Sequence, residues 1–169
     1  MPDDNRQMAA AGKFLLGLAV FFSVISFALW LIPLKAVELF FAAPVLEALK
    51  LFGFSGSIDA ANEPVRIILD ASAIPIAISY LCTGLMEIAI IASAVLASFG
   101  ISLQKRIVGV AAGILAIIIF NFIRILASVL IILWFGLDIG GFSHDLLFRI
   151  FLFIVIAGFY FAWMKWAEK

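Results

Sequence analysis

The sequence predicts an all-α polytopic membrane protein: a bundle of four transmembrane helices, with an interfacial helix and a short extracellular β-hairpin. Three observations predict this fold class. First, 66% of the 169 residues are hydrophobic and 13% are charged, which is more apolar material than a soluble core of this size can bury. Second, the apolar residues form long runs of membrane-spanning length. Third, basic residues gather at particular ends of these runs.

Four apolar runs define the expected spans, and we expect all of them to belong to one integral membrane domain covering residues 1–169. The spans are expected at residues 14–34, 82–99, 107–130 and 146–164. The first run is longer than a signal-peptide core of roughly 7 to 15 residues, so we expect this helix to be retained. The third run continues to Phe135, which is too long for one perpendicular span, and we expect it to tilt, protrude or break near Asn121 and Arg124.

The segment between the first two spans, residues 35–81, is expected on the outer side of the membrane. Its first part, residues 36–52, mixes Glu38 and Lys50 with apolar residues around Pro44, which favours an interfacial or re-entrant segment. Farther along, apolar residues alternate with their neighbours on both sides of residues 71–73. This alternation predicts the hairpin.

The distribution of basic residues predicts that both termini are cytoplasmic. Lys105 and Arg106 occupy the loop after the second run, and the last run ends in two tryptophans with Lys165 and Lys169. The loop at residues 136–143 has no lysine or arginine, so it is expected outside. Overall the eleven basic residues balance eleven acidic ones, and no net charge favours nucleic acid as a partner.

The single cysteine, Cys82, is either a buried small hydrophobe or a nucleophile, because one cysteine excludes an intramolecular disulfide, a CxxC pair and a multi-cysteine metal site. Arg124 and His144 are expected at the same depth. At about 1.5 Å per helical residue, the three residues lie about 27 to 31 Å from the cytoplasmic ends of their helices. A bundle of antiparallel helices can therefore bring them to one site at the outer boundary.

The three residues would form a coherent catalytic site if they met. A cysteine at a helix N-terminus beside Arg124 has its thiolate favoured by the helix dipole and by the cation. Backbone N–H groups after Cys82, at Thr83 and Gly84, are expected to receive the oxyanion of a tetrahedral intermediate together with Arg124. His144 is expected to protonate the leaving amine.

Each of these residues also has a purely structural interpretation. Cys82 can be a packing residue, His144 an interfacial residue or helix cap, and Arg124 a snorkelling cation. Asn121, one turn before Arg124, can hydrogen-bond between helices. Arg149 can pair with an acidic neighbour.

A GxxxG pattern, formed by Gly109 and Gly113, lies near the start of the third run. Two small residues one turn apart allow another helix to approach closely. We therefore expect helix packing at these glycines and no chemistry.

Three motifs in order resemble those of the exosortase and archaeosortase membrane transpeptidases. They are the run Leu81-Cys82-Thr83-Gly84-Leu85, the run Asn121-Phe122-Ile123-Arg124-Ile125, and His144 at the start of the last span. The family pattern is a cysteine followed two positions later by glycine at a helix start, an Asn-x-x-Arg motif in the next helix, and a histidine or arginine before the last. The resemblance covers the chain from Val65 to its C-terminus.

The resemblance implies a protein-sorting cysteine transpeptidase in the plasma membrane of a prokaryote, with its active site facing outward. Its substrate would be the C-terminal tripartite sorting tail of an exported protein: a signature motif, a hydrophobic helix and a basic cluster. Cys82 would form a thioester, which would pass to an amine acceptor, carried by a lipid in archaeal members. Arg124 would stabilise the oxyanion and His144 would move the proton, and no metal or organic cofactor would be required.

Two departures from the family leave alternatives open. The chain is shorter than many members, as expected of a minimal catalytic core with a narrow set of partners. The third catalytic position can be filled by His144 or, in reserve, by Arg149. Two other functions remain open. One is a noncatalytic transporter or scaffold subunit, in which Arg124, Glu87 and Arg149 form a buried polar network. The other is a hydrolase in which water resolves the thioester.

Overall fold

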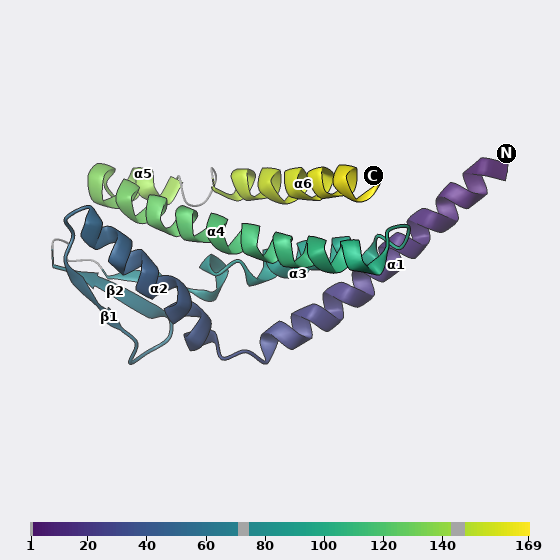
Figure 1. Cartoon of the computed structure of the whole chain (residues 1–169). Helices are drawn as coiled ribbons and strands as arrows, with labels where there is room; N and C mark the ends of the chain where they lie inside the picture. The colour runs from purple at the N-terminus through teal and green to yellow at the C-terminus, as the bar shows by residue number, and fades with distance from the viewer. Residues whose placement is uncertain (1, 71–74, 143–147) are drawn as a thin grey trace. The chain divides into compact units, whose positions relative to one another are not determined.

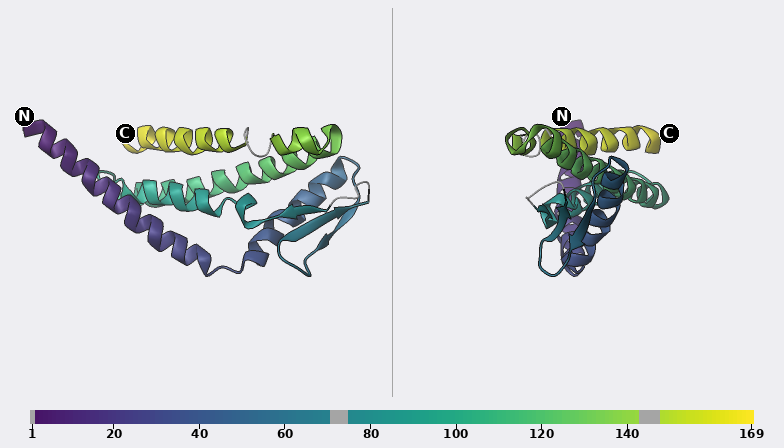
Figure 2. Two further views of the ribbon diagram at one scale, coloured as in Figure 1. Left: turned by 180° about the vertical axis from the view of Figure 1, so that it is seen from behind. Right: turned by 90° about the vertical axis from the view of Figure 1, so that its left-hand side faces the viewer.

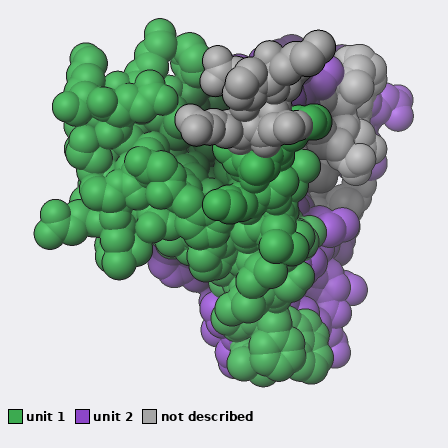
Figure 3. Space-filling model, turned by 90° about the vertical axis from the view of Figure 1, so that its right-hand side faces the viewer, with its two compact units in different colours: residues 1–31, 86–117, 155–169 green, residues 32–85, 118–154 purple. Residues whose placement is uncertain are grey.

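The computed structural model describes residues 2–70, 75–142 and 148–169, apart from the side chains of residues 2–6, 140–142 and 148–149. This part of the chain is mostly helical and carries a small three-stranded sheet (Figure 1). It divides into two compact units, each made of separate stretches of sequence (Figure 3). Unit 1 comprises Met1–Leu31, Met86–Ile117 and Val155–Lys169, and unit 2 comprises Ile32–Leu85 and Ile118–Ile154.

Three of the described helices are long and apolar enough to cross a membrane. They are α1 (Pro2–Trp30), with its apolar span at Gln7–Trp30, α4 (Leu103–Phe135), and α6 (Phe148–Ala167), with its span at Ile150–Ala167. The apolar window of α1 has no buried share, and large hydrophobic side chains such as Leu16 and Val24 are exposed. Helices of this kind are suited to a lipid environment, and the three together indicate a membrane protein.

The expected second span is shorter in the structure than in the prediction, and the count of four spans is not confirmed. The helix there, α3 (Leu85–Ala97), has 13 residues. At about 1.5 Å per residue it is about 20 Å long, which is less than the roughly 30 Å of a hydrocarbon core. It begins three residues later than predicted because Gly84, with φ of +76°, separates it from a preceding turn.

The end of the first helix and the course of α4 also differ from the prediction, for local reasons. The first helix ends at Trp30 and not at residue 34, because Pro33 disfavours helical geometry in the residue before it and starts the next helix. Helix α4 is continuous through Asn121 and Arg124, so of the three expected alternatives the break is wrong, while a tilted or protruding helix stays a prediction. It ends where Gly136 adopts φ of +88° and donates its N–H to the Ile132 carbonyl at 3.0 Å. A short helix, α5 (Leu137–Phe142), follows it.

In unit 2 the strands β1 (Gly56–Asp59), β2 (Val65–Leu69) and β3 (Ile76–Ile78) form an antiparallel sheet in the order β1-β2-β3. The predicted hairpin is confirmed as the pairing of β2 with β3, in which Val65 lies opposite Ile78 and Ile67 lies opposite Ile76. Strand β1 was not predicted, because residues 53–62 are small and polar and lack an apolar alternation. The location of this sheet outside the membrane stays a prediction.

Helix α2 (Leu34–Leu51) lies along the sheet (Figures 1 and 2). Its buried residues recur at helical spacing and form one stripe: Glu38, Phe41, Ala42, Val45, Leu46 and Leu49. This stripe packs with the inward-facing residues of β2 and with Ile125 and Val129 of α4. Pro44 lies within α2 without ending it, and the interfacial location of the helix stays a prediction.

A buried carboxylate joins α2 to the start of β2. The Val65 N–H donates to Glu38 Oε2 at 2.9 Å, and Glu38 is 3% exposed. A backbone donor at the first residue of a strand needs an acceptor when it is buried. Glu38 supplies this acceptor from a position 27 residues earlier in the chain.

In unit 1 the two glycines of the GxxxG pattern lie against α6, as predicted. A Cβ on Gly109 would overlap the Trp163 ring, and one on Gly113 would lie 3.2 Å from the Phe159 ring. The Trp163 indole donates Nε1–H to the Lys105 carbonyl at 3.2 Å. Because the ring fills the space beside Gly109, the sequence there requires glycine.

We expect Glu38→Ala to destabilise the protein by about 1 to 3 kcal/mol, because it leaves the buried Val65 N–H without an acceptor. Glu38→Gln keeps an oxygen at this place and should cost less. The matched control is Glu47→Ala, which removes an exposed partner of Lys50 worth about 0 to 1 kcal/mol. Thermal unfolding in one detergent measures all three, and equal stabilities for Glu38→Ala and Glu47→Ala would contradict the role of this bond.

We expect Gly109→Ala to lower the stability by about 1 to 3 kcal/mol, because the added methyl must displace Trp163 from its bond to the Lys105 carbonyl. Gly158→Ala on α6 is the control, since nothing lies within 4 Å of a Cβ at that position. It should raise stability slightly through helix propensity. Indole fluorescence during unfolding reports both, and an unchanged Gly109→Ala midpoint would mean that the predicted contact is not restrictive.

Candidate functional site

Cys82 ends a single turn of 3-10 helix, η1 (Tyr80–Cys82), which follows β3 by one residue. The Cys82 N–H donates to the Ser79 carbonyl at 2.8 Å, and the Thr83 N–H and hydroxyl both donate to the Tyr80 carbonyl, at 3.1 and 2.7 Å. Cys82 therefore precedes α3 by three residues and does not lie in its first turn. The predicted help from the α3 dipole is accordingly weaker than expected.

The hydrogen bonds of η1 also change the predicted oxyanion donors. The Thr83 N–H, expected to face an oxyanion, is already bonded to the Tyr80 carbonyl, so this part of the prediction is wrong. The turn uses this donor because its hydrogen bonds run over three residues and close at Thr83. The Gly84 N–H and the Arg124 guanidinium remain as candidate donors.

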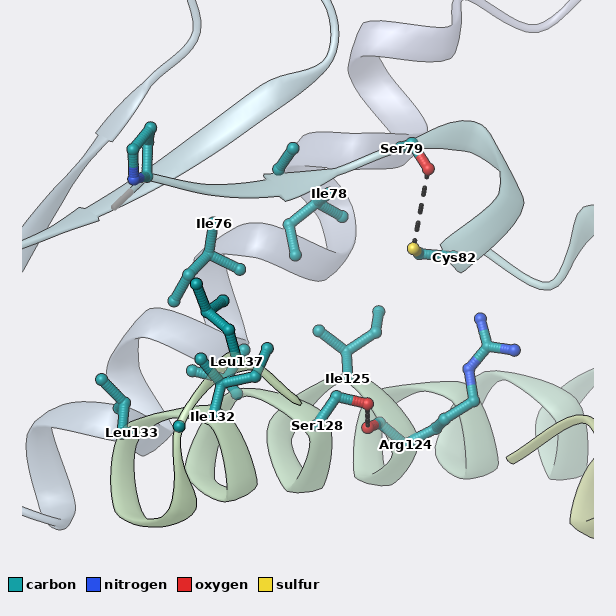
Figure 4. Close-up of a pocket in the computed structure, with 14 residues that line it drawn as sticks. Ile76, Ile78, Ser79, Cys82, Arg124, Ile125, Ser128, Ile132, Leu133 and Leu137 are labelled. Carbon is teal, nitrogen blue, oxygen red and sulfur yellow. Dashed lines mark hydrogen bonds between the residues drawn. The ribbon is translucent and has the colours of Figure 1, made fainter. Parts of the chain in front are cut away.

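The Cys82 thiol is half-buried against the core of unit 2 and has a hydroxyl beside it. Ser79 Oγ lies 3.6 Å from Cys82 Sγ, and either atom can be the donor (Figure 4). A hydroxyl at this position donates to a thiolate and accepts from a thiol. Both protonation states of Cys82 are thus accommodated.

Arg124 is a buried cation on an apolar stretch of α4. Its side chain is 7% exposed, and Nη2 donates to the Leu81 carbonyl at 3.3 Å. Nε is buried and has no hydrogen-bond partner among the described residues. Asn121, one turn earlier on the same face, is fully buried. Arg124 therefore holds the residue before Cys82 and keeps donor capacity in reserve.

A cavity of about 540 Å³ in unit 2 is lined by both Cys82 and Arg124. Figure 4 shows the Arg124 guanidinium extending from α4 toward the segment that carries Cys82. The rest of the lining comes from β3 and its flanks, from α4 and from the start of α5, and is mainly apolar. None of the described residues that line it is acidic. The cavity thus combines a thiol and one cation with a hydrophobic wall, at a volume typical of ligand sites.

The structure brings together two of the three predicted catalytic residues. Cys82 and Arg124 share the cavity, and Asn121 is buried one turn before Arg124 on the same helix. His144 lies outside the described residues, and so does the side chain of Arg149, although its backbone belongs to α6. The meeting of all three stays a prediction.

Sequence reasoning missed two parts of the site. One is Ser79, whose contact with Cys82 arises because the 3-10 turn brings residues three apart together. The other is the lining by β3, which alternation predicted as a strand without indicating that its residues line a cavity with Cys82.

Comparisons of the chain with protein families, with curated proteins and with solved structures returned no match. The class of protein is therefore defined by the structure alone: a mostly helical membrane protein with three candidate spans in its described part and a small sheet beside a cavity lined by a thiol.

We expect alkylation of Cys82 by N-ethylmaleimide to slow by about tenfold in Arg124→Met, because the cation that shares the cavity favours the reactive thiolate. Arg124→Lys should keep much of the rate, and Leu133→Met, at another lining position, should leave it unchanged. Intact mass against time gives the rate constants at a single reactive cysteine. Equal rates in the parent and Arg124→Met would show that Arg124 does not influence the reactivity of the Cys82 thiol.

Proposed function

We propose that this protein is a membrane cysteine peptidase and transpeptidase of the exosortase and archaeosortase type. It would cleave the C-terminal sorting tail of an exported protein and transfer the new end to an amine carried by a lipid. The observation that carries the proposal is the shared cavity: a cysteine followed by Thr83-Gly84 and the arginine of Asn-x-x-Arg line the same hollow, although their positions are far apart in sequence.

The first chemical step uses Cys82 as the nucleophile. Its sulfur attacks the scissile carbonyl, forming a C–S bond and moving an electron pair to the carbonyl oxygen. Arg124 Nε is a buried donor without a partner among the described residues, so it is available to donate to this oxyanion. Collapse of the intermediate breaks the C–N bond, and the tail leaves as an amine after taking a proton, a role we assign to His144, with Arg149 in reserve.

The second step resolves the thioester. An acceptor amine attacks its carbonyl, the C–S bond breaks, and the thiol is restored. The apolar lining of the cavity keeps water scarce around the thioester, which favours an amine over water as the acceptor. This lining supports transfer over the hydrolase alternative.

The membrane arrangement is part of the same proposal. The protein would cross a prokaryotic plasma membrane four times, with α3 and the turn before it forming the second crossing. Both termini would be cytoplasmic and the cavity would open outward, where exported proteins arrive. Lys105 and Arg106 support this orientation, since they lie together in the first turn of α4, at the end that the charge rule assigns to the inside.

The proposal predicts a change in substrate mass that depends on Cys82. A candidate tailed protein is co-expressed with the parent, with Cys82→Ala or with Ser23→Ala, a control on the exposed surface of α1. We expect tail loss and a gain of lipid-sized mass with the parent and the control, and a rate below about 10⁻³ of the parent with Cys82→Ala, because the nucleophile carries the reaction.

Intact mass spectrometry distinguishes the other functions in the same samples. Tail loss without added mass would replace the transpeptidase by a hydrolase. Identical masses with the parent and Cys82→Ala, across several tails, would contradict catalysis and favour the noncatalytic membrane subunit.

A further inference from the structure

Strand β3 has one edge that no described strand covers. In the order β1-β2-β3, it pairs with β2 on one side only. An uncovered edge presents backbone N–H and C=O groups that can pair with another extended chain. Natural proteins use such edges to bind extended peptides by adding a strand to the sheet.

The uncovered edge faces the cavity that holds Cys82 and Arg124. Five consecutive residues, from Pro75 through β3 to Ser79, line this cavity. Side chains of a strand alternate between the two faces of its sheet, so consecutive residues line one space together only along the edge of the strand. Strand β3 ends one residue before η1, so the edge leads to the thiol.

The charge of the cavity indicates what its occupant must contribute. Arg124 forms no ion pair with any described residue, and its buried Nε has no described partner. The described residues that line the cavity include none that is acidic, while Ile125, Ile132 and Leu133 make the wall apolar. A complementary occupant has apolar side chains and presents an oxygen to the guanidinium.

We propose that the cavity binds an apolar peptide in extended conformation, which adds a strand to β3 and directs a carbonyl or carboxylate oxygen to Arg124. This inference rests on the proposed function and names how its substrate is held. A fatty acid would also satisfy the apolar wall and the cation, but it has no amides to pair with a strand edge. The edge therefore selects a peptide.

The length of the edge limits the register of the bound segment. Strand β3 has three residues, and Pro75 before it has no N–H to donate. Pairing is confined to a short stretch of about four substrate residues next to the bond that Cys82 would attack. The signature motif of a sorting tail would then be read as a strand, with alternate side chains facing the cavity.

The test uses the full chain in lipid nanodiscs and a blocked Val-Ala-Val-Ala chloromethyl ketone as the probe. The Cys82 sulfur displaces chloride, so that a C–S bond forms, the C–Cl bond breaks and the thiol proton passes to the buffer. The tethered peptide then occupies the cavity at full stoichiometry. Three reference adducts are compared: one from chloroacetamide, one from a decyl chloromethyl ketone, and a series in which the peptide is N-methylated at one amide at a time.

Hydrogen exchange of the β3 backbone gives the result. Among residues 76–79, we expect the amides that point away from β2 to exchange at least about tenfold more slowly in the peptide adduct than in the chloroacetamide adduct. N-methylation should remove this protection at every second peptide amide, because only alternate amides face the strand. The amides of β1, at the opposite edge of the sheet, are the internal control and should not change.

Two outcomes would overturn the inference. One is a peptide adduct without protection of β3. The other is protection of β3 that does not depend on peptide amides. Protection by the decyl adduct would assign the cavity to a lipid chain, and protection retained by all N-methylated peptides would exclude backbone pairing. Alkylation requires no acyl transfer, so this result is independent of tail processing. Processed tails with unprotected β3 amides would reject strand addition alone, and protected β3 amides with unprocessed tails would reject the proposed catalysis alone.

Discussion

A guanidinium buried among apolar side chains must find oxygen partners, and this requirement at Arg124 organises the site. Leaving its N–H groups without partners is costly for a buried cation, and none of the described residues that line the cavity with Arg124 carries a carboxylate. Its bond to the Leu81 carbonyl satisfies part of the requirement and at the same time holds the residue next to Cys82. The stabilisation of a charge and the placement of a thiol are therefore one interaction.

The conformation of the segment around Cys82 follows from a similar requirement, that its backbone N–H groups find hydrogen-bond acceptors. Residues 79–83 lie between a strand and a helix, where neither ladder can satisfy their N–H groups. The 3-10 turn pairs the N–H groups of Cys82 and Thr83 internally, and Gly84 then redirects the chain into α3. A thiol on such a turn is fixed at its backbone while its side chain stays half-buried and open to the cavity.

The sequence allowed the helices and the paired strands β2 and β3 to be predicted, because both leave a periodic apolar pattern. It also indicated the close approach at Gly109, where two small residues one turn apart have a single structural use. It failed where tertiary context decides. Strand β1 is polar, and it forms because it pairs with its neighbour β2. The start of α3 depends on a positive φ at Gly84, which composition does not reveal.

Within the candidate site, the polar residues were foreseeable and their surroundings were not. Cys82 and Arg124 stand out because a thiol and a cation are rare in an apolar sequence, whereas the role of Glu38 depends on a partner 27 positions away. The burial of Glu38 could not be predicted from helical spacing alone, because no nearby residue in the sequence indicates the donor that its carboxylate would bind. The hydrogen bond from the Thr83 N–H to the Tyr80 carbonyl could not be predicted from the sequence either, because it arises from a single turn of 3-10 helix.

The two compact units interleave along the chain, and this has a consequence for biogenesis and for evolution. Unit 2 begins with residues 32–85 and is completed only by residues 118–154, with the middle stretch of unit 1 synthesised in between. On a ribosome, the half of the cavity that carries the thiol must therefore wait for the half that carries the arginine. For the same reason no single recombination point can transfer either unit intact to another protein, so this chain is inherited as a whole and not as exchangeable modules.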